Sequence, residues 1–181
     1  LAEGASVERY VRFYVEKVNT AAPGNNVCLR EIQVYAKEAE EPTEEPWNLA
    51  LNRPVTASGA VEGTSASNAV DGSKTTQWNS PDLKTFKATD NSKDQEPQTP
   101  QWLQMDLGAT GSKLQTVKIT YAANKVWAME YELQTTDTPE DADSWQQVAY
   151  VSRASANSTL VNGEGQNIAD PVSYTHLTLP T

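Results

Sequence analysis

The sequence is poor in the residues that carry most enzyme chemistry. Histidine and cysteine each occur once, and lysine and arginine together number 14 against 24 aspartates and glutamates. A single cysteine excludes an internal disulfide and a thiolate metal cluster. Cys28 is interpreted as a small buried apolar residue, with a reactive thiol as the alternative. The formal net charge of −10 opposes binding to nucleic acid or acidic lipid head groups, because both are polyanions.

The chain also lacks a long apolar run, so we expect no membrane insertion. It begins at a leucine without an apolar signal segment, which we interpret as an internal piece of a larger protein. The last segment, VSYTHLTLPT (172–181), resembles a translated sequencing adapter and is set aside as a non-native scar. It holds His176, so the natural sequence would contain no histidine. We therefore expect no enzyme, and assign any catalysis to a missing neighbouring domain.

Apolar residues alternate with polar ones at a period of two in several short runs, separated by turn residues. This pattern is typical of strands that bury one face. It recurs at 11–15, 103–107, 117–121 and 131–133. The sequence therefore predicts an all-β fold, an antiparallel β-sandwich.

Two polar stretches interrupt the strand pattern. The segment KEAEEPTEEP (37–46) is acidic and carries proline, so it cannot bury apolar area. We interpret it as an interdomain linker, with a functional acidic tail as the alternative. Residues 84–100 are predicted to form a long surface loop.

Several motifs occur in order along the second part of the chain. They are NLALNRPVTAS (48–58), SNAVDGSKTTQW (67–78), QWLQMDLG (101–108), LQTVKITY (114–121) and YELQTTD (131–137), followed by Trp145. Together they resemble the discoidin, or coagulation-factor type C, domain family, and in particular bacterial family 32 carbohydrate-binding modules.

The resemblance implies a discoidin-like jelly roll over residues 47–171 that binds a glycan without catalysing a reaction. It implies covalently linked neighbouring domains, such as a glycoside hydrolase, and a location outside the cell or on the bacterial cell surface. Adhesion to a protein or another cell-surface ligand is the alternative function.

The resemblance extends to the start of the chain, where RYVRFYVEKVN (9–19) and CLREIQVY (28–35) are similar to strands that normally close such a domain. We interpret residues 1–36 as the end of a preceding module, and residues 47–171 as a second module that lacks its last strands. We further hypothesise that this strand pair folds back and fills the gap in the second module, which would hide otherwise unpaired strand edges.

The resemblance also implies a structural calcium site around an Asp-Gly turn. The implied ligands are the carbonyls of Asn68, Ser73 and Arg30, the carboxylates of Asp71 and Glu31, and Thr76. A tight turn can wrap oxygens around a hard cation that prefers six to eight oxygen ligands. Without the resemblance, an Asp-Gly pair indicates only an ordinary turn.

A sugar site combines an exposed aromatic ring with hydrogen-bonding groups on loops. Trp78, Trp102 and Trp145 are expected to pack in the core or on a sheet face. Trp127 lies between two predicted strands, where sugar binding and packing are both open. By analogy with the family, further candidates at the same end are Asn79, Asp82, Phe86, Tyr121 and Asn124. The segment YAANKVW (121–127) lacks the arginine of galactose-binding members, so galactose specificity is not expected.

Overall fold

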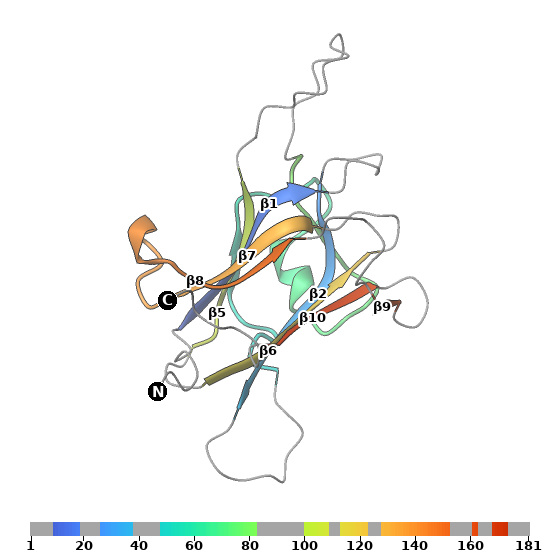
Figure 1. Ribbon diagram of the computed structural model, residues 1–181. Coiled ribbons are helices and arrows are strands. Elements are labelled where there is room, and N and C mark those ends of the chain that lie inside the picture. Colours follow the sequence, from blue (N-terminus) through green and yellow to red (C-terminus); the bar gives the residue numbers. More distant parts are fainter. Residues whose placement is uncertain are drawn as a thin grey trace.

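The protein forms two antiparallel five-stranded sheets packed face to face (Figure 1). The computed structural model describes residues 9–18, 26–37, 48–82, 100–108, 113–122, 128–152, 161–162 and 168–173. The first sheet has the order β3 (Val55–Ala57), β5 (Gln101–Asp106), β1 (Tyr10–Val18), β7 (Ala128–Thr136) and β8 (Gln146–Ser152). The second has the order β4 (Trp78–Asn79), β2 (Cys28–Lys37), β6 (Lys113–Tyr121), β10 (Ile168–Ser173) and β9 (Val161–Asn162). The predicted all-β sandwich is confirmed.

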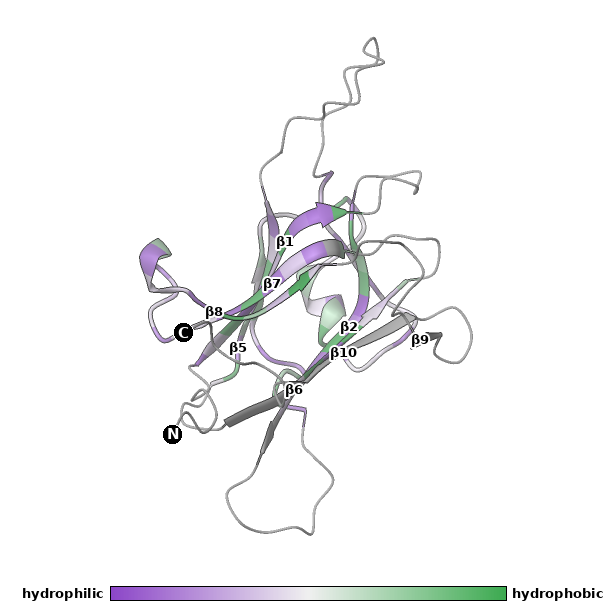
Figure 2. Ribbon diagram, in the orientation of Figure 1, coloured by the Kyte–Doolittle hydropathy of each residue, from purple (hydrophilic) through white to green (hydrophobic). Residues whose placement is uncertain are grey.

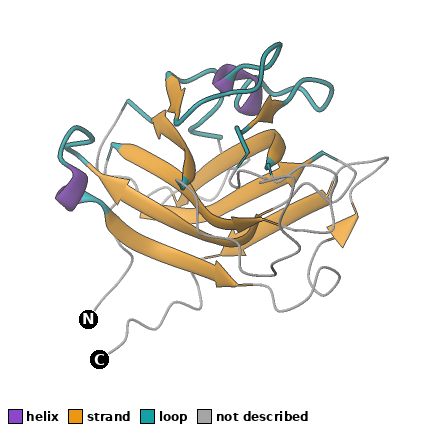
Figure 3. Ribbon diagram, turned by 90° about the horizontal axis from the view of Figure 1, so that it is seen from above, coloured by secondary structure: helices purple, strands orange, loops and turns teal. Residues whose placement is uncertain are grey.

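The described helices are two short 3₁₀ turns, η1 (Ala66–Ala69) and η2 (Ala142–Ser144). Figure 3 shows the strands in layers, with the loop that carries η1 gathered at one side of them. Within the described part of the chain, no helix has the length and apolar character that crossing a membrane requires.

The core lies between the sheets and follows the alternation in the sequence. In β1 the buried side chains Val11, Phe13 and Val15 alternate with residues that face outward, and Val18 at the end of the strand is buried as well. From the second sheet, Ile32 and Ile119 lie in the same core cluster. Figure 2 shows apolar and polar residues mixed along single strands, as expected for strands with one buried face.

The amino-terminal strand pair is inserted in both sheets, which confirms the fold-back hypothesis. Strand β1 lies between β5 and β7, and β2 lies between β4 and β6. Phe13 of β1 is opposite Leu103 on one side and Leu133 on the other. The pair therefore supplies a central strand to each sheet of the sandwich. That it originates from a preceding module stays a prediction.

The chain re-enters the fold directly beside the end of β2. Tyr35 forms a bridge with Asn48, and the amide of Leu49 donates to the carbonyl of Val34 at 2.7 Å. Of the predicted linker, Lys37 ends β2, and residues 38–46 lie outside the described residues.

The carboxyl-terminal strand extends into the segment that was set aside as a scar. Strand β10 runs to Ser173, so Val172 and Ser173, set aside as part of a scar, pair with Val117 and Thr116 of β6. Strand addition uses main-chain hydrogen bonds, which an extended segment of almost any sequence can supply. Val172 and Ser173 thus belong to the sheet, while the origin of the segment stays a prediction. Residues 174–181, with His176, lie outside the described residues.

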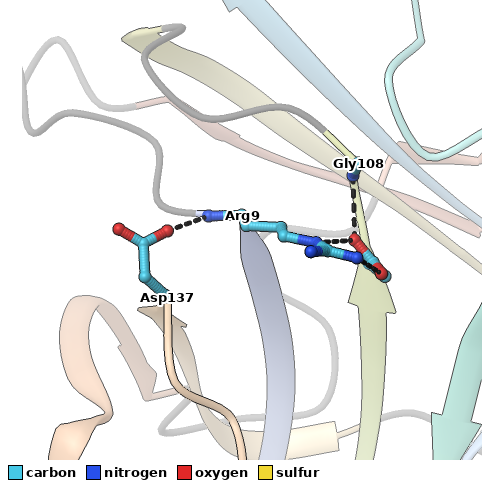
Figure 4. A network of polar contacts seen from close by, with 4 residues as sticks. Arg9, Gly108 and Asp137 are labelled. Carbon is cyan, nitrogen blue, oxygen red and sulfur yellow. Dashed lines mark hydrogen bonds and ion pairs between the residues drawn. The ribbon is translucent and has the colours of Figure 1, made fainter.

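The start of β1 is held by a polar network (Figure 4). Arg9 donates from Nε and Nη2 to the two carboxylate oxygens of Asp106, at 2.8 and 2.6 Å. The backbone amide of Arg9 donates to Asp137, which follows β7, at 2.8 Å. The amide of Gly108 donates to Asp106 at 2.9 Å. One residue thereby connects the ends of three neighbouring strands.

Candidate functional site

The Asp-Gly turn lies in the loop that follows η1. Gly72 has a φ of 76°, in the left-handed region that favours glycine. Asp71 Oδ1 accepts from the backbone amide of Ser73 at 2.8 Å, and Oδ2 accepts from Thr76 Oγ1 at 2.7 Å. Three of the expected ligand residues, Asp71, Ser73 and Thr76, therefore converge around one carboxylate.

Glu31 reaches the same turn from β2. The pairing of β2 with β6 shifts in register between Leu29 and Glu31, as at a β-bulge. The Glu31 side chain is 4% exposed, and its Oε2 accepts from the amide of Gly72 at 3.2 Å. Within the described part of the chain, its other oxygen, Oε1, is buried without a hydrogen-bond partner. A buried carboxylate oxygen without a partner is costly, so this atom marks a place where a cation would be stabilised.

The electrostatics of the turn agree with its geometry. Burial raises the pKa of Glu31 to about 7, and the negative charge of Asp71 adds to the rise. The hydrogen bond from Gly72 opposes it only in part. The charge of Asp71 thus lies close enough to disfavour the charge of Glu31, which a cation between the two carboxylates would offset.

The donor set fits a hard cation bound largely through neutral oxygens. Among the described residues, no three histidine, cysteine, aspartate or glutamate side chains form a group that could hold a metal. Two carboxylates with carbonyl and hydroxyl oxygens remain, and such oxygen donors suit calcium. The hydroxyl of Thr76 lies 3.5 Å from the carbonyl oxygen of Ser73.

The remaining expected ligands lie nearby. The side chain of Asn68 donates to the carbonyl of Gln77 at 3.0 Å, which closes the loop. Arg30, at the register shift, donates from Nη1 to the carbonyl of Lys74 at 2.5 Å. The contact from Arg30 thus holds the turn against β2. The ligand roles of the Asn68 and Arg30 carbonyls stay predictions.

The structure describes three of the six expected sugar contacts: Asn79, Asp82 and Tyr121. Asn79, partly exposed, accepts from the side-chain amide of Gln77 at 3.0 Å, and Asp82 is exposed. Asn79 and Tyr121 pair with neighbouring residues of β2, so they lie at the same end of the second sheet. Tyr121 is fully covered, however, and a covered ring offers no stacking face. Phe86, Asn124 and Trp127 lie outside the described residues.

Trp78, Trp102 and Trp145 pack as expected, in the core or on a sheet face. Trp78 is fully buried, and its ring nitrogen donates to the carbonyl of Gly59 at 2.9 Å. Trp102 is a partly exposed residue between buried neighbours of β5. The ring of Trp145 lies 3.9 Å from the guanidinium carbon of Arg12, on the outer face of the first sheet.

That outer face is the feature that sequence reasoning missed. Its signal was present in YVRFYV (10–15), where the residues between the buried ones are tyrosine, arginine and tyrosine. These outward residues lie on a strand, whereas the sugar contacts were expected on loops.

No family model matches the chain, and no curated protein or solved structure matches it either. The fold class alone does not define an activity, because sandwiches carry many unrelated functions.

Proposed function

We propose that this chain is a non-catalytic carbohydrate-binding module of the discoidin type. It directs a parent secreted or cell-surface protein, such as a glycoside hydrolase, to glycans. The observation that carries the proposal is the convergence of Glu31 on the Asp71 turn. These residues come from segments about 40 positions apart and meet where the resemblance implies a cation.

In this proposal calcium is structural. Glu31 and Asp71 hold it with the carbonyl of Ser73 and the hydroxyl of Thr76, and the Asn68 carbonyl completes the set. The ion supplies positive charge to the two carboxylates and ties the loop to β2. It takes no part in a reaction.

The same carboxylates could suggest catalysis, since two close carboxyl groups with one raised pKa are typical of glycoside hydrolases. The burial of Glu31 argues against this alternative. A side chain that is 4% exposed cannot reach a glycosidic bond in solution. Its position suits a bound ion better than a substrate.

Ligand contacts are proposed for five residues, of which the structure describes Asn79 in β4 and Asp82 shortly after it. Trp127 supplies the aromatic face, and Asn79, Asp82, Asn124 and Phe86 supply polar and apolar contacts around it. Sugars present C–H faces to aromatic rings and hydroxyl groups to amides and carboxylates. Tyr121 is left out of this set because its ring is covered.

A glycan array with the intact chain tests the proposal. We expect binding to at least one neutral glycan and at least a tenfold loss of affinity on Trp127→Ala, with an unchanged melting curve. Tyr35→Ala is the matched control, because Tyr35 is a partly exposed aromatic residue of β2 outside the proposed contacts. Undiminished binding by Trp127→Ala would remove Trp127 from the site. If the chain binds no glycan on the array but does bind a protein ligand, the adhesion alternative is favoured.

A further inference from the structure

The first sheet has one face on the core and one face turned outward. The outward residues, here called the outer face, are identified by alternation with buried neighbours in β1, β5, β7 and β8. They include Arg12, Tyr14, Trp102, Gln104, Glu132, Gln134 and Tyr150. All are partly or fully exposed, and Tyr150 is 46% exposed.

Strand register places three aromatic residues of the outer face in one row. Trp102 of β5 is opposite Tyr14 of β1, Tyr14 is opposite Glu132 of β7, and Glu132 is opposite Tyr150 of β8. Opposite residues on one face have Cβ atoms about 5 Å apart. The row therefore crosses four strands and extends over roughly 14 Å, three strand spacings.

A second row, rich in amides, runs parallel to the aromatic row. Gln104 of β5 is opposite Arg12 of β1, and Arg12 is opposite Gln134 of β7. Thr56 of β3 extends the row beyond Gln104. Because these residues are two positions along each strand from the aromatic row, the rows lie about 7 Å apart.

Contacts between side chains hold Arg12, Gln134 and Glu132 in place, and the guanidinium of Arg12 lies 5.4 Å from the ring centroid of Tyr14. Arg12 Nε donates to Gln134 Oε1 at 2.7 Å, and Gln134 Nε2 donates to Glu132 Oε2 at 2.5 Å. Trp145 covers the guanidinium of Arg12. A surface whose side chains are fixed before binding loses less conformational entropy when a ligand arrives.

The charge of this face selects among possible ligands. Glu132 lies within the aromatic row. Glu16 lies nearby: burial raises its pKa most, and the negative charges of Glu132 and Glu130 raise it further. Together with the net charge of −10, these carboxylates disfavour polyanions. Aromatic rings beside amides suit a ligand with C–H faces and uncharged hydroxyl groups.

We propose that the outer face is a second binding site, which takes a neutral, extended oligosaccharide lying across β5, β1, β7 and β8. Sugar rings stack on Trp102 and Tyr150, with Tyr14 between them beneath the guanidinium of Arg12, while their hydroxyl groups reach Gln104 and Gln134. The site shares its ligand class with the proposed function but none of its residues, so either site can fail without the other.

Native gel electrophoresis of the intact chain tests the proposal, with gels containing neutral β-glucan, xylan or galactomannan, and polygalacturonate as the acidic comparison. We expect retardation by at least one neutral polysaccharide and none by polygalacturonate. Tyr150→Ala and Trp102→Ala should each weaken binding at least tenfold, whereas Tyr35→Ala should leave it unchanged. Tyr150 is the most exposed of the three aromatic residues, so Tyr150→Ala should disturb the fold least. A melting curve verifies the fold of each variant.

The possible outcomes separate the two sites. Loss of retardation in the outer-face variants alone supports the outer face, whatever the fate of the Trp127 site. Loss in Trp127→Ala alone, or retardation that Tyr150→Ala leaves intact, overturns the outer-face proposal. So does the absence of retardation in every neutral gel. Concentration-dependent sedimentation that Tyr150→Ala abolishes would also overturn it, by showing that the face binds a second copy of the chain.

Discussion

Glu31 and Asp71 have different roles at the turn, and the difference decides which substitution tests for calcium. Asp71 accepts hydrogen bonds from Ser73 and Thr76, so its removal weakens the turn with or without an ion. Glu31 accepts one hydrogen bond, from Gly72, and keeps an oxygen buried without a partner among the described residues. Its charge is costly unless a cation accompanies it.

Glu31→Gln should therefore abolish the calcium response without lowering the stability of the calcium-free fold. A glutamine oxygen can still accept from Gly72, and the buried charge is gone. For the unmodified chain, calcium at a hundredfold excess over its Kd should add about 2.7 kcal/mol. At roughly 2 to 4 °C per kcal/mol this corresponds to a rise in Tm of about 5 to 10 °C, measured with calcium and with chelator.

Asp143→Asn is the matched control, because Asp143 is an exposed carboxylate in η2. It should keep the full calcium-induced rise. A Glu31→Gln protein that still gains stability from calcium would place the ion elsewhere.

Sequence reasoning found much of this turn at the level of single residues. Adjacent residues Asp71 and Gly72 indicated the turn itself, whereas the grouping of Ser73 and Thr76 with Asp71 came from the family resemblance. Glu31 could be reached only through the family resemblance, because it lies about 40 residues earlier in the chain. The full burial of Tyr121 could not be predicted from the sequence. Alternation shows which residues share a face of a strand, but not how completely neighbouring segments cover that face.

At the scale of elements, the anchor of β1 is an ion pair with a definite pH dependence. The hydrogen bonds from Arg9 hold the pKa of Asp106 below its ordinary value, and the amide of Gly108 lowers it further. The folded protein thus binds the Asp106 proton more weakly than the unfolded chain does. The pair contributes stability above the unfolded pKa of about 3.9, and that contribution is lost as the pH falls through the lower folded value.

Arg9→Gln should lower Tm at pH 7 by less than about 4 °C, because the pair is partly exposed and screened by solvent. The difference from the unmodified chain should shrink below about pH 4 and at high salt. Thermal melts from pH 2 to 8 measure it.

Lys17→Gln is the comparison at the other end of β1, where a single contact of 3.1 Å joins Lys17 to Glu130. It should change Tm less than Arg9→Gln does. A Tm difference for Arg9→Gln that persists unchanged at pH 2 would show that Arg9 acts through packing, not through its charge.

Strand positions were predictable where alternation is long. The runs at 117–121 and 131–133 fall within β6 and β7, and the run at 103–107 lies in β5 except for Leu107, which follows the strand. The register shift in β2 was harder to predict from the sequence than the strand positions were. In CLREIQVY (28–35), Leu29 and Ile32 are both buried although three positions separate them, which strict alternation forbids. Such a change of parity is a signal for a bulge that could be sought in the sequence.

At the scale of the whole molecule, the position of the first two strands is the least local property of the fold. Alternation predicts that residues 11–15 form a strand but not that the strand lies between β5 and β7. Its partners are about 90 and 120 residues away in the chain. The resemblance supplied this placement, because it identified the pair as closing strands of a sandwich.

Substitution in β1 should therefore destabilise the whole sandwich. Phe13 is fully buried, and its ring centroid lies 4.9 Å from that of Tyr131 in β7. Phe13→Ala should cost about 3 to 5 kcal/mol, and Leu133→Ala in β7 about 2 to 5 kcal/mol. Because the two side chains lie on neighbouring strands of one core, both variants should shift the same single unfolding transition in urea, followed by tryptophan fluorescence and circular dichroism. Two separate transitions, with Phe13→Ala moving only one, would show that residues 9–37 fold apart from the remainder of the chain.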